Sequence, residues 1–230
     1  LVLICPGGAY GMHSQRESEA VAIKMNEMGF HACILSYSLA PMMFPASLLD
    51  LCEAMNYIRS HIEEWNIIEN KIVVAGFSAG GHLTASLGVY WNSNLIKKYL
   101  DYPAEMIKPN GLMLAYPVIT SKDPTHRDSI VNVLGDTKEY TENDVSLEKL
   151  VSKDVPPVFM WHTDEDDFVP IEGAFEFAYQ CRKQKIPLEF HVFRRGCHGL
   201  SLATEETCWP DGNGVQMECS LWPSMFANWM

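Results

Sequence analysis

Apolar positions along the chain form short continuous runs, separated by longer segments in which apolar residues recur every three or four positions. The short runs predict buried strands, because strands covered by helices on both faces are apolar at nearly every position. Alternation of such strands with helical segments is typical of crossover connections in a parallel sheet. We therefore expect an α/β fold with strands near 1–5, 31–37, 72–76, 111–116, 157–162 and 188–193.

Helical segments lie between these strands, and the first has the clearest start signal. Ser14 followed three residues later by Glu17 predicts a capping box, and Gly29 predicts the C-terminal stop. The spacing of apolar residues predicts further helices near 46–65, 79–91, 172–184 and 219–229.

Two segments interrupt this alternation, at residues 92–110 and 117–156, where Pro, Asn, Asp and Lys are frequent. The second segment follows a strand whose carboxyl end points to the edge at which open α/β sheets bind ligands. We therefore expect a single domain over residues 1–230 with a small lid-like insertion around 117–156. The alternative is a solvated excursion without a role.

Composition and charge exclude several classes of protein. The 230 residues are 47% apolar, which is typical of a folded domain with a full core. There are 17 basic and 29 acidic residues, and the net charge of −12 argues against a surface for nucleic acid. Apolar runs are far shorter than a membrane span and no basic-then-apolar leader opens the chain, so we expect a cytoplasmic protein.

Cysteine usage and the first residues add two expectations. Seven cysteines at irregular spacing, without a Cys-x-x-Cys pair, argue against a disulfide framework and against structural zinc. The chain begins inside the apolar run from Leu1 to Cys5, as if within a strand. We expect the whole protein to have residues ahead of Leu1.

The strongest chemical motif is Gly76-Phe77-Ser78-Ala79-Gly80, which joins an apolar strand to a helix-forming segment. Small residues two positions before and after the serine let neighbouring backbone pass close to a strained turn. The turn presents the hydroxyl at the carboxyl edge of the sheet, beside a helix N-terminus. The motif predicts Ser78 as a nucleophile; the alternative is a structural serine in a tight turn.

A nucleophilic serine needs backbone donors for the oxyanion that forms during acyl transfer. The segment Pro6-Gly7-Gly8-Ala9-Tyr10 follows the first strand, and its glycines let N–H groups approach a ligand. Together with the N–H of Ala79, the residue after the nucleophile, it predicts an oxyanion hole. Gly7, Gly8 and Ala9 all remain candidates.

The serine also needs a base, and position distinguishes among the eight histidines. His198 lies just past the last strand, between Gly196 and Gly199, in a loop that can reach across the sheet edge. His162, at the end of the strand near 157–162, is the main alternative. The other histidines near the motifs suit structural roles; they are His31, His82 and His191.

An acidic run at residues 164–167 completes the chain order Ser, Asp, His that α/β-hydrolases use. With the motifs named above and Gly196-Cys-His-Gly199, the chain resembles the α/β-hydrolase fold. Within it, the chain is similar to small esterases related to acetyl xylan esterases and hormone-sensitive-lipase-like carboxylesterases. The resemblance implies Asp166 as the acid, because it stands four residues before Pro170 in an Asp-x-x-Val-Pro segment. Asp164 and Asp167 are the alternatives.

The resemblance implies a mostly parallel central sheet with helices on both faces, and strands ahead of the first one visible here. It implies a serine esterase that hydrolyses short-chain esters, acetyl above all, of sugars or xylo-oligosaccharides through an acyl-enzyme. No metal or organic cofactor is needed for this chemistry. The expected partner is a small-molecule or oligosaccharide ester rather than nucleic acid or a membrane, and homo-oligomerisation stays open.

Aromatic residues predict where a sugar ring would stack, and we expect Tyr10 and Trp161 to contact substrate; Trp91 and Trp209 are also available. The triad fixes the chemistry and not the substrate. A general small-ester carboxylesterase, a thioesterase, a peptidase and a lactonase are therefore alternatives. A non-catalytic hydrolase-like binding protein is the alternative from another class.

Overall fold

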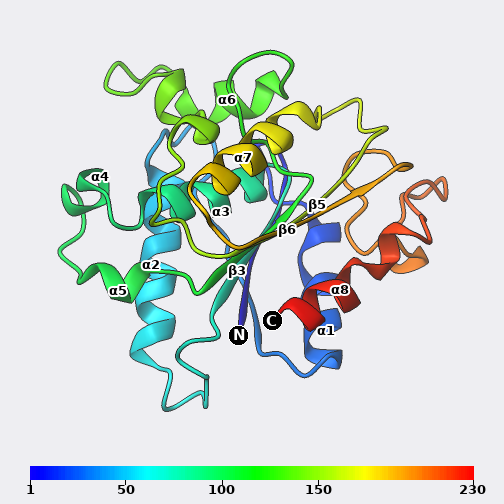
Figure 1. Ribbon diagram of the computed structural model, residues 1–230, viewed down its shortest axis with the longest axis horizontal. Coiled ribbons are helices and arrows are strands. Elements are labelled where there is room, and N and C mark those ends of the chain that lie inside the picture. Colours follow the sequence, from blue (N-terminus) through cyan, green and yellow to red (C-terminus); the bar gives the residue numbers. More distant parts are fainter.

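Six parallel strands form the centre of the computed structural model, which describes residues 1–230 (Figure 1). Their order across the sheet is β2-β1-β3-β4-β5-β6, and every neighbouring pair is parallel. All six predicted strands are confirmed, with ends that differ by up to three residues. They are β1 (Val2–Cys5), β2 (Ala32–Ile34), β3 (Val73–Phe77), β4 (Gly111–Ala115), β5 (Val158–Thr163) and β6 (Leu188–Phe193).

The chain direction across the sheet reverses at β1, which pairs with β2 on one side and with β3 on the other. The loops after β1 and β3 therefore leave the same edge of the sheet next to each other. In open α/β sheets, a crevice for ligands forms at such a reversal. The two segments with the predicted oxyanion donors and the predicted nucleophile are thus brought together by topology.

Helices cover both faces of the sheet (Figure 1). One face packs against α1 (Glu19–Glu27) and α8 (Trp222–Trp229). The other face packs against α2 (Ala46–Ser60), α3 (Ala79–Tyr90) and α7 (Glu172–Lys183). The five predicted helices are confirmed, although α2 ends five residues earlier than the apolar spacing predicts.

Central strands are buried on both faces, which explains why their sequences are apolar at nearly every position. In β1, Val2 and Ile4 pack toward α1 and α8, whereas Leu3 and Cys5 pack toward α2 and α3. Complete burial of one such aliphatic side chain contributes about 1.5–3 kcal/mol to folding. No helix of the structure has the length and apolar character required to cross a membrane.

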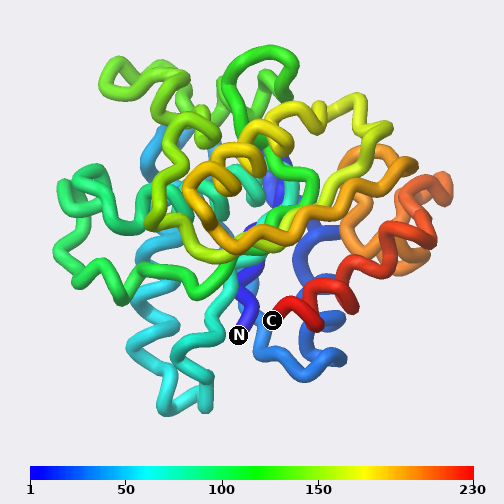
Figure 2. Tube along the Cα trace, in the orientation of Figure 1, coloured from blue at the N-terminus to red at the C-terminus, as the bar shows by residue number.

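The start of β1 and the end of α8 bring the two chain ends close together, as the N and C labels in Figure 2 show, at the amino end of β1. The Leu1 ammonium donates to the carbonyl oxygen of Lys71, and the Lys71 ammonium donates to the carbonyl oxygen of Met230. The termini therefore lie away from the loops that follow the carboxyl ends of the strands.

The capping box predicted at the start of the first helix is wrong. Residues Gln15–Glu17 form a short 3-10 turn, α1 begins only at Glu19, and the side chain of Ser14 caps nothing. Glu17 is instead buried and accepts hydrogen bonds from the Gly7 N–H and the Tyr116 hydroxyl. The Glu17 carboxylate therefore bonds to residues distant in the chain and not to the helix start that the capping-box pattern predicts.

Three short helices lie within residues 92–110 and 117–156, which interrupt the alternation of strands and helices: α4 (Asn94–Lys97), α5 (Ala104–Ile107) and α6 (Arg127–Leu134). The start of α6 is capped by His126, whose ring nitrogen Nδ1 accepts from the Ser129 N–H. Histidine is an uncommon N-cap residue, so the sequence contained no standard start signal here.

The turn from β3 into α3 brings backbone segments into direct contact. A Cβ at Gly80 would overlap the carbonyl oxygen of Cys5 at the end of β1, and a Cβ at Gly76 would overlap the carbonyl oxygen of Gly80. Because the overlapped atoms are backbone, neither position can accept a side chain without a shift of the strand or the helix. The spacing of the glycines is therefore a packing requirement.

We expect Gly80→Ala to lower the free energy of unfolding by about 1–3 kcal/mol, because the new methyl group forces α3 away from β1. Helix propensity alone would favour alanine by about 1 kcal/mol, so it opposes this outcome. Urea denaturation measures the change. Gly11→Ala is the control, since its Cβ would make only ordinary contacts, with Asn132 Nδ2 at 3.5 Å and with the Gly8 carbonyl oxygen at 3.8 Å. A Gly80→Ala protein as stable as the wild type would contradict this account.

Candidate active site

Ser78 occupies the turn between β3 and α3 in a strained backbone conformation, with φ 52° and ψ −118°. A non-glycine residue in such a region costs on the order of 1–3 kcal/mol, which the surrounding structure must compensate. The Ser78 N–H donates to the carbonyl oxygen of Ala115 at 3.0 Å, and the Val118 N–H donates to the Ser78 carbonyl oxygen at 3.2 Å. These bonds hold the turn against β4.

The structure brings the three predicted triad residues into hydrogen-bond contact. His198 Nε2 lies 2.8 Å from Ser78 Oγ, and His198 Nδ1 lies 2.7 Å from Asp166 Oδ2. The other carboxylate oxygen, Asp166 Oδ1, accepts from the N–H groups of Phe168 at 3.0 Å and Val169 at 2.8 Å. All four distances are in the normal range for hydrogen bonds. Both oxygens of Asp166 are thereby fixed in direction.

The environment of Asp166 keeps its carboxyl group ionised. Burial alone would raise the pKa of Asp166, but the hydrogen bond from His198 and the N–H of Val169 outweigh this and leave the pKa below its usual value. An ionised carboxylate can only accept, so the proton shared with His198 belongs to Nδ1. Nε2 is then left as an acceptor facing the Ser78 hydroxyl.

The alternative acids and the alternative base form no hydrogen bond with Ser78 or His198. Asp164 and Asp167 are exposed at the surface of the same loop. His162 is fully buried, accepts from the Thr163 N–H at 2.9 Å, and lies 3.9 Å from Asp166 Oδ2. Burial also lowers the pKa of His162 to about 4, so it is neutral at pH 7.

The loop after β1, residues 6–10, is called the oxyanion loop below. The Gly7 N–H donates to Glu17 Oε2 at 2.8 Å and is not available to an oxyanion, which corrects the prediction for this residue. Gly8 and Ala9 have φ values of 120° and 55°, and their N–H groups donate to no protein atom. Ala79 is the first residue of α3, where N–H groups have no acceptor within the helix.

Two predicted substrate contacts, Tyr10 and Trp161, are core residues instead. Trp161 is 0% exposed and stacks on Trp222 beneath the sheet. Tyr10 is 2% exposed, and its hydroxyl lies 2.8 Å from His82 Nδ1. These two predictions are wrong because both side chains point into the interior. A single aromatic residue in a sequence does not indicate whether its ring faces the core or a pocket.

His82 connects the oxyanion loop to the segment near residue 145. Its Nε2 lies 2.9 Å from the carbonyl oxygen of Val145, which can only accept, so Nε2 carries the proton. Nδ1 is therefore the acceptor for the Tyr10 hydroxyl. Burial lowers the pKa of His82 to about 4, which keeps the ring neutral and this pattern of donors fixed.

A pocket of about 850 Å³ opens above Ser78 and His198. Its wall combines the oxyanion loop with Arg16, whose guanidinium stacks 3.6 Å above the ring of Trp209. The remaining wall residues come from separate loops; they include Met12, His126, Phe168, Cys197, Asp211 and Asn213. Of these wall residues outside the oxyanion loop, only Trp209 was a candidate from the sequence, because no motif links loops so far apart in the chain.

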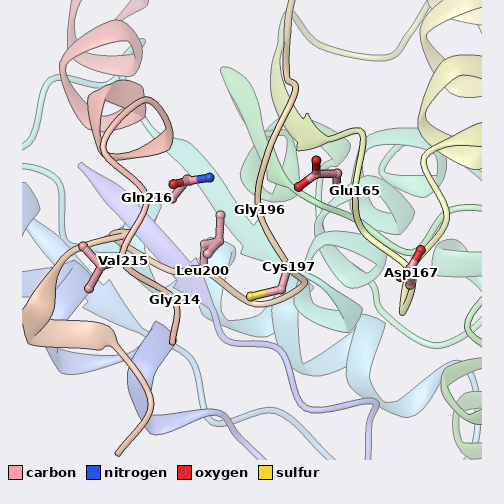
Figure 3. A pocket seen from close by; sticks show the side chains of 8 residues that line it. All are labelled: Glu165, Asp167, Gly196, Cys197, Leu200, Gly214, Val215 and Gln216. Carbon is pink, nitrogen blue, oxygen red and sulfur yellow. The ribbon is translucent and has the colours of Figure 1, made fainter. Parts of the chain in front are cut away.

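A second pocket of about 440 Å³ lies beside the loop that carries His198 (Figure 3). Figure 3 shows Glu165 and Asp167 on one side of it and Val215 and Gln216 on the other, with Cys197 between them. Cys197 lines both pockets, but Ser78 is absent from this one. The pocket above Ser78 is therefore the candidate substrate site.

A serine, a histidine and an aspartate in contact at the carboxyl edge of a parallel sheet, in the chain order Ser, Asp, His, define an α/β-hydrolase. Comparison with family models then identifies the group within that class. The model named BD-FAE matches residues 1–180, a range that includes Ser78 and Asp166. The chain belongs to the BD-FAE family.

Curated relatives extend this assignment. The chain is 37% identical to endo-1,4-beta-xylanase B of Butyrivibrio fibrisolvens over 89% of its length, and 26% identical to an acetylxylan esterase of Xylanibacter ruminicola over 86%. It spans only 33% of the first protein and 40% of the second.

Solved structures of esterases share the whole fold. An acetyl ester-xyloside bifunctional hydrolase from Caldicellulosiruptor lactoaceticus matches 99% of this chain and 80% of its own, with a TM-score of 0.86 and 33% identity. A carboxylesterase from Lactobacillus plantarum matches 99% of this chain and 83% of its own, with a TM-score of 0.89 and 28% identity.

The buried histidines make folding stability depend on pH. An unfolded His82 takes up a proton below about pH 6.5, whereas the folded one does so only near pH 4. Stability is therefore fully present above about pH 6.5 and is lost as the pH falls toward 4. We expect His82→Gln, which can keep both hydrogen bonds, to reduce the loss of unfolding free energy between pH 7 and pH 4.5 by about 1–3 kcal/mol.

Urea denaturation at the two pH values measures this difference. The exposed residue His31 supplies the control, as His31→Gln removes a histidine without changing a buried contact. An equal loss of stability in the His82→Gln variant and the wild type would rule out His82 as a source of the acid sensitivity.

Proposed function

We propose that the chain is a serine esterase that hydrolyses short acyl esters, acetyl above all, of sugars or other polar alcohols. The observation that carries the proposal is the position of His198, which contacts Ser78 Oγ through one ring nitrogen and Asp166 Oδ2 through the other. This arrangement lets one imidazole remove a proton from the nucleophile while the carboxylate stabilises the resulting imidazolium.

Acylation begins when His198 Nε2 accepts the Ser78 hydroxyl proton and Oγ forms a bond to the ester carbonyl carbon. The carbonyl oxygen becomes an oxyanion, and free N–H groups of the oxyanion loop and of Ala79 are the proposed donors to it. One such donor contributes typically about 3 kcal/mol to the transition state. The imidazolium then protonates the alcohol oxygen as its bond to the carbonyl carbon breaks.

Deacylation repeats these steps with water in place of serine. His198 takes a proton from water, the hydroxyl oxygen attacks the acyl-enzyme, and Ser78 leaves with the proton returned from the imidazolium. Asp166 stays ionised throughout and stabilises the charged ring. Apart from the substrate and the attacking water, the proposed route uses side chains and N–H groups of this chain.

The pocket supports a polar alcohol group in the substrate. Its wall contains the charged side chains of Arg16 and Asp211, the amide of Asn213 and the indole of Trp209. Residues 117–156 contribute His126 to the same wall, and we propose them as a lid-like wall of the site. The names of two relatives, an acetylxylan esterase and an acetyl ester-xyloside hydrolase, support acetylated sugars.

A general small-ester carboxylesterase is the second candidate. The closeness of the fold to the Lactobacillus plantarum carboxylesterase favours it, because the TM-score of 0.89 extends over 99% of this chain. The two candidates share the triad chemistry and differ only in how much the alcohol part of the substrate contributes to binding.

We expect Ser78→Ala and His198→Ala each to reduce kcat on an aryl acetate by about 10⁶-fold, and the double variant to be hardly worse. Members of a triad act as one unit, so their effects do not add. Steady-state hydrolysis measures the rates, and a fluorophosphonate probe should label the wild type but not Ser78→Ala. Ser60→Ala, at an exposed helix position, should behave as the wild type. Retention of more than a few per cent of activity in His198→Ala would exclude His198 as the base.

The assignment of Asp166 as the acid of the triad is tested by comparing it with the neighbouring residues Asp164 and Asp167. Asp166→Asn should lower kcat by about 10³–10⁴-fold, because the amide favours the wrong imidazole tautomer. Asp164→Asn and Asp167→Asn make the same chemical change at exposed positions and should have mild effects. A larger loss at either neighbour would move the assignment of the acid.

We expect kcat/KM to be highest for acetyl esters in a series of aryl esters with acyl groups of two to twelve carbons. A long acyl group gains about 0.8 kcal/mol for each buried methylene, and this gain requires a continuous apolar tunnel. The pocket wall instead interleaves apolar residues with Arg16, Asp211 and Asn213. A maximum at eight carbons or more would refute the preference for short acyl groups. Equal rates with and without a sugar alcohol would favour the general carboxylesterase.

A further inference from the structure

A carboxylate outside the triad, Glu17, lies almost fully buried in the wall of the pocket. Glu17 is 3% exposed, and each of its two oxygens accepts one hydrogen bond. Oε2 accepts from the Gly7 N–H at 2.8 Å, and Oε1 accepts from the Tyr116 hydroxyl at 2.7 Å. The carboxylate therefore joins the oxyanion loop after β1 to the residue that directly follows β4.

Tyr116 extends this connection to the loop that carries His198. Its hydroxyl oxygen accepts from the Ser201 N–H at 2.9 Å, three residues past His198. Its ring packs edge-on against the His198 imidazole, with centroids 5.0 Å apart and planes at 74°. Burial, together with the charge of Glu17, raises the pKa of Tyr116 well above its usual value, so the hydroxyl stays protonated as a donor to Glu17.

Ser201 is bonded to the Glu17 segment in a second way. Its hydroxyl donates to the carbonyl oxygen of Arg16 at 2.5 Å, and its own carbonyl oxygen accepts from Trp222 Nε1 at 2.8 Å. The loop that carries His198 is thus fixed to residues 16 and 17 through both the Ser201 side chain and the Tyr116 hydroxyl.

A carboxylate suits this place better than an amide of the same size. Both partners of Glu17 are donors, and an ionised carboxylate accepts at each oxygen. Glutamine would present an NH₂ group to one of the two donors, so one donor would face another donor in a buried site. Such a mismatch costs the full desolvation of the unpaired groups and favours a shift of the loops.

We propose that Glu17 is a positioning residue: with Tyr116 it holds the oxyanion loop and the His198 loop in the relative position that the reaction requires. The inference rests on the proposed serine esterase function. Glu17 lines the pocket but makes no hydrogen bond to Ser78 or His198; its carboxylate bonds to the Gly7 N–H on one side and to the Tyr116 hydroxyl on the other, and it acts through these two. Displacement of reacting groups by about 1 Å can reduce the rate about 10²-fold, so a loosened connection should slow the chemical step.

The experiment compares Glu17→Gln, Tyr116→Phe and the double variant with the wild type, using phenyl acetate and active-site titration. Both substitutions keep side-chain volume nearly unchanged. We expect kcat per titrated site to fall about 10- to 10²-fold in each single variant, with KM changed less than threefold. The double variant should be close to the worse single variant, because both remove the same connection. Glu19→Gln, the same chemical change at an exposed position two residues away, is the matched control.

A second readout separates positioning from a general structural role. Methylboronic acid adds to an activated serine, and one oxygen of the tetrahedral adduct takes the oxyanion position. Its Kd should rise in the two variants in proportion to their loss of kcat. Melting temperature and the fraction of titratable sites report folding, and a merely structural role would change these while leaving kcat per site and Kd as in the wild type.

Variants whose kcat per titrated site and boronate Kd both stay within twofold of the wild type would overturn the positioning role, whatever their melting temperatures. A wild type that neither hydrolyses phenyl acetate nor reacts with a fluorophosphonate would overturn the proposed function and this inference with it. The two failures are therefore distinguishable, because only the first leaves an active wild-type enzyme.

Discussion

Direct backbone contact between the start of α3 and the end of β1 is the constraint on which the site depends. It exists because Gly80 has no side chain, so that α3 can lie against the Cys5 carbonyl oxygen. This contact places the oxyanion loop beside the strained turn at Ser78, and Gly8, Ala9 and Ser78 line the same pocket. Pairing of β1 with β3 sets the two segments next to each other, and this contact brings them to the short separation seen here.

Electrostatics then fix the proton positions around this turn. Asp166 is buried but ionised because it accepts three hydrogen bonds, and its charge holds the His198 proton on Nδ1. The nearby histidines His82 and His162 are held neutral by burial. Of the rings close to the pocket floor, His198 alone bonds both the serine and the carboxylate. Burial thus keeps His82 and His162 neutral in structural hydrogen bonds, whereas the charge of Asp166 orients His198 with Nε2 toward Ser78.

Much of this arrangement could be predicted from the sequence, because it depends on local patterns. Continuous apolar runs identified the strands, and the glycine spacing around Ser78 identified the turn, since both follow from burial and steric contact. Long-range partners were not predictable in this way. Glu17 resembles the end of a capping box, yet its carboxylate pairs with Gly7 and with Tyr116, 99 residues further along the chain. Trp161 has an aromatic ring of the kind that stacks on sugars, but it lies on the buried strand β5 and is not exposed to the pocket.

Chemistry and recognition are supported by different parts of the molecule. Ser78 and the proposed oxyanion donors lie at strand ends and a helix start, where sheet hydrogen bonds and close packing fix the backbone, and His198 lies in a loop that is held through Tyr116 and Ser201. The rest of the pocket wall, in contrast, consists mostly of residues from loops, including Arg16 stacked on Trp209. Under the proposed function, the reaction depends on the sheet edge, and we expect changes in the surrounding loops to alter which alcohol fits.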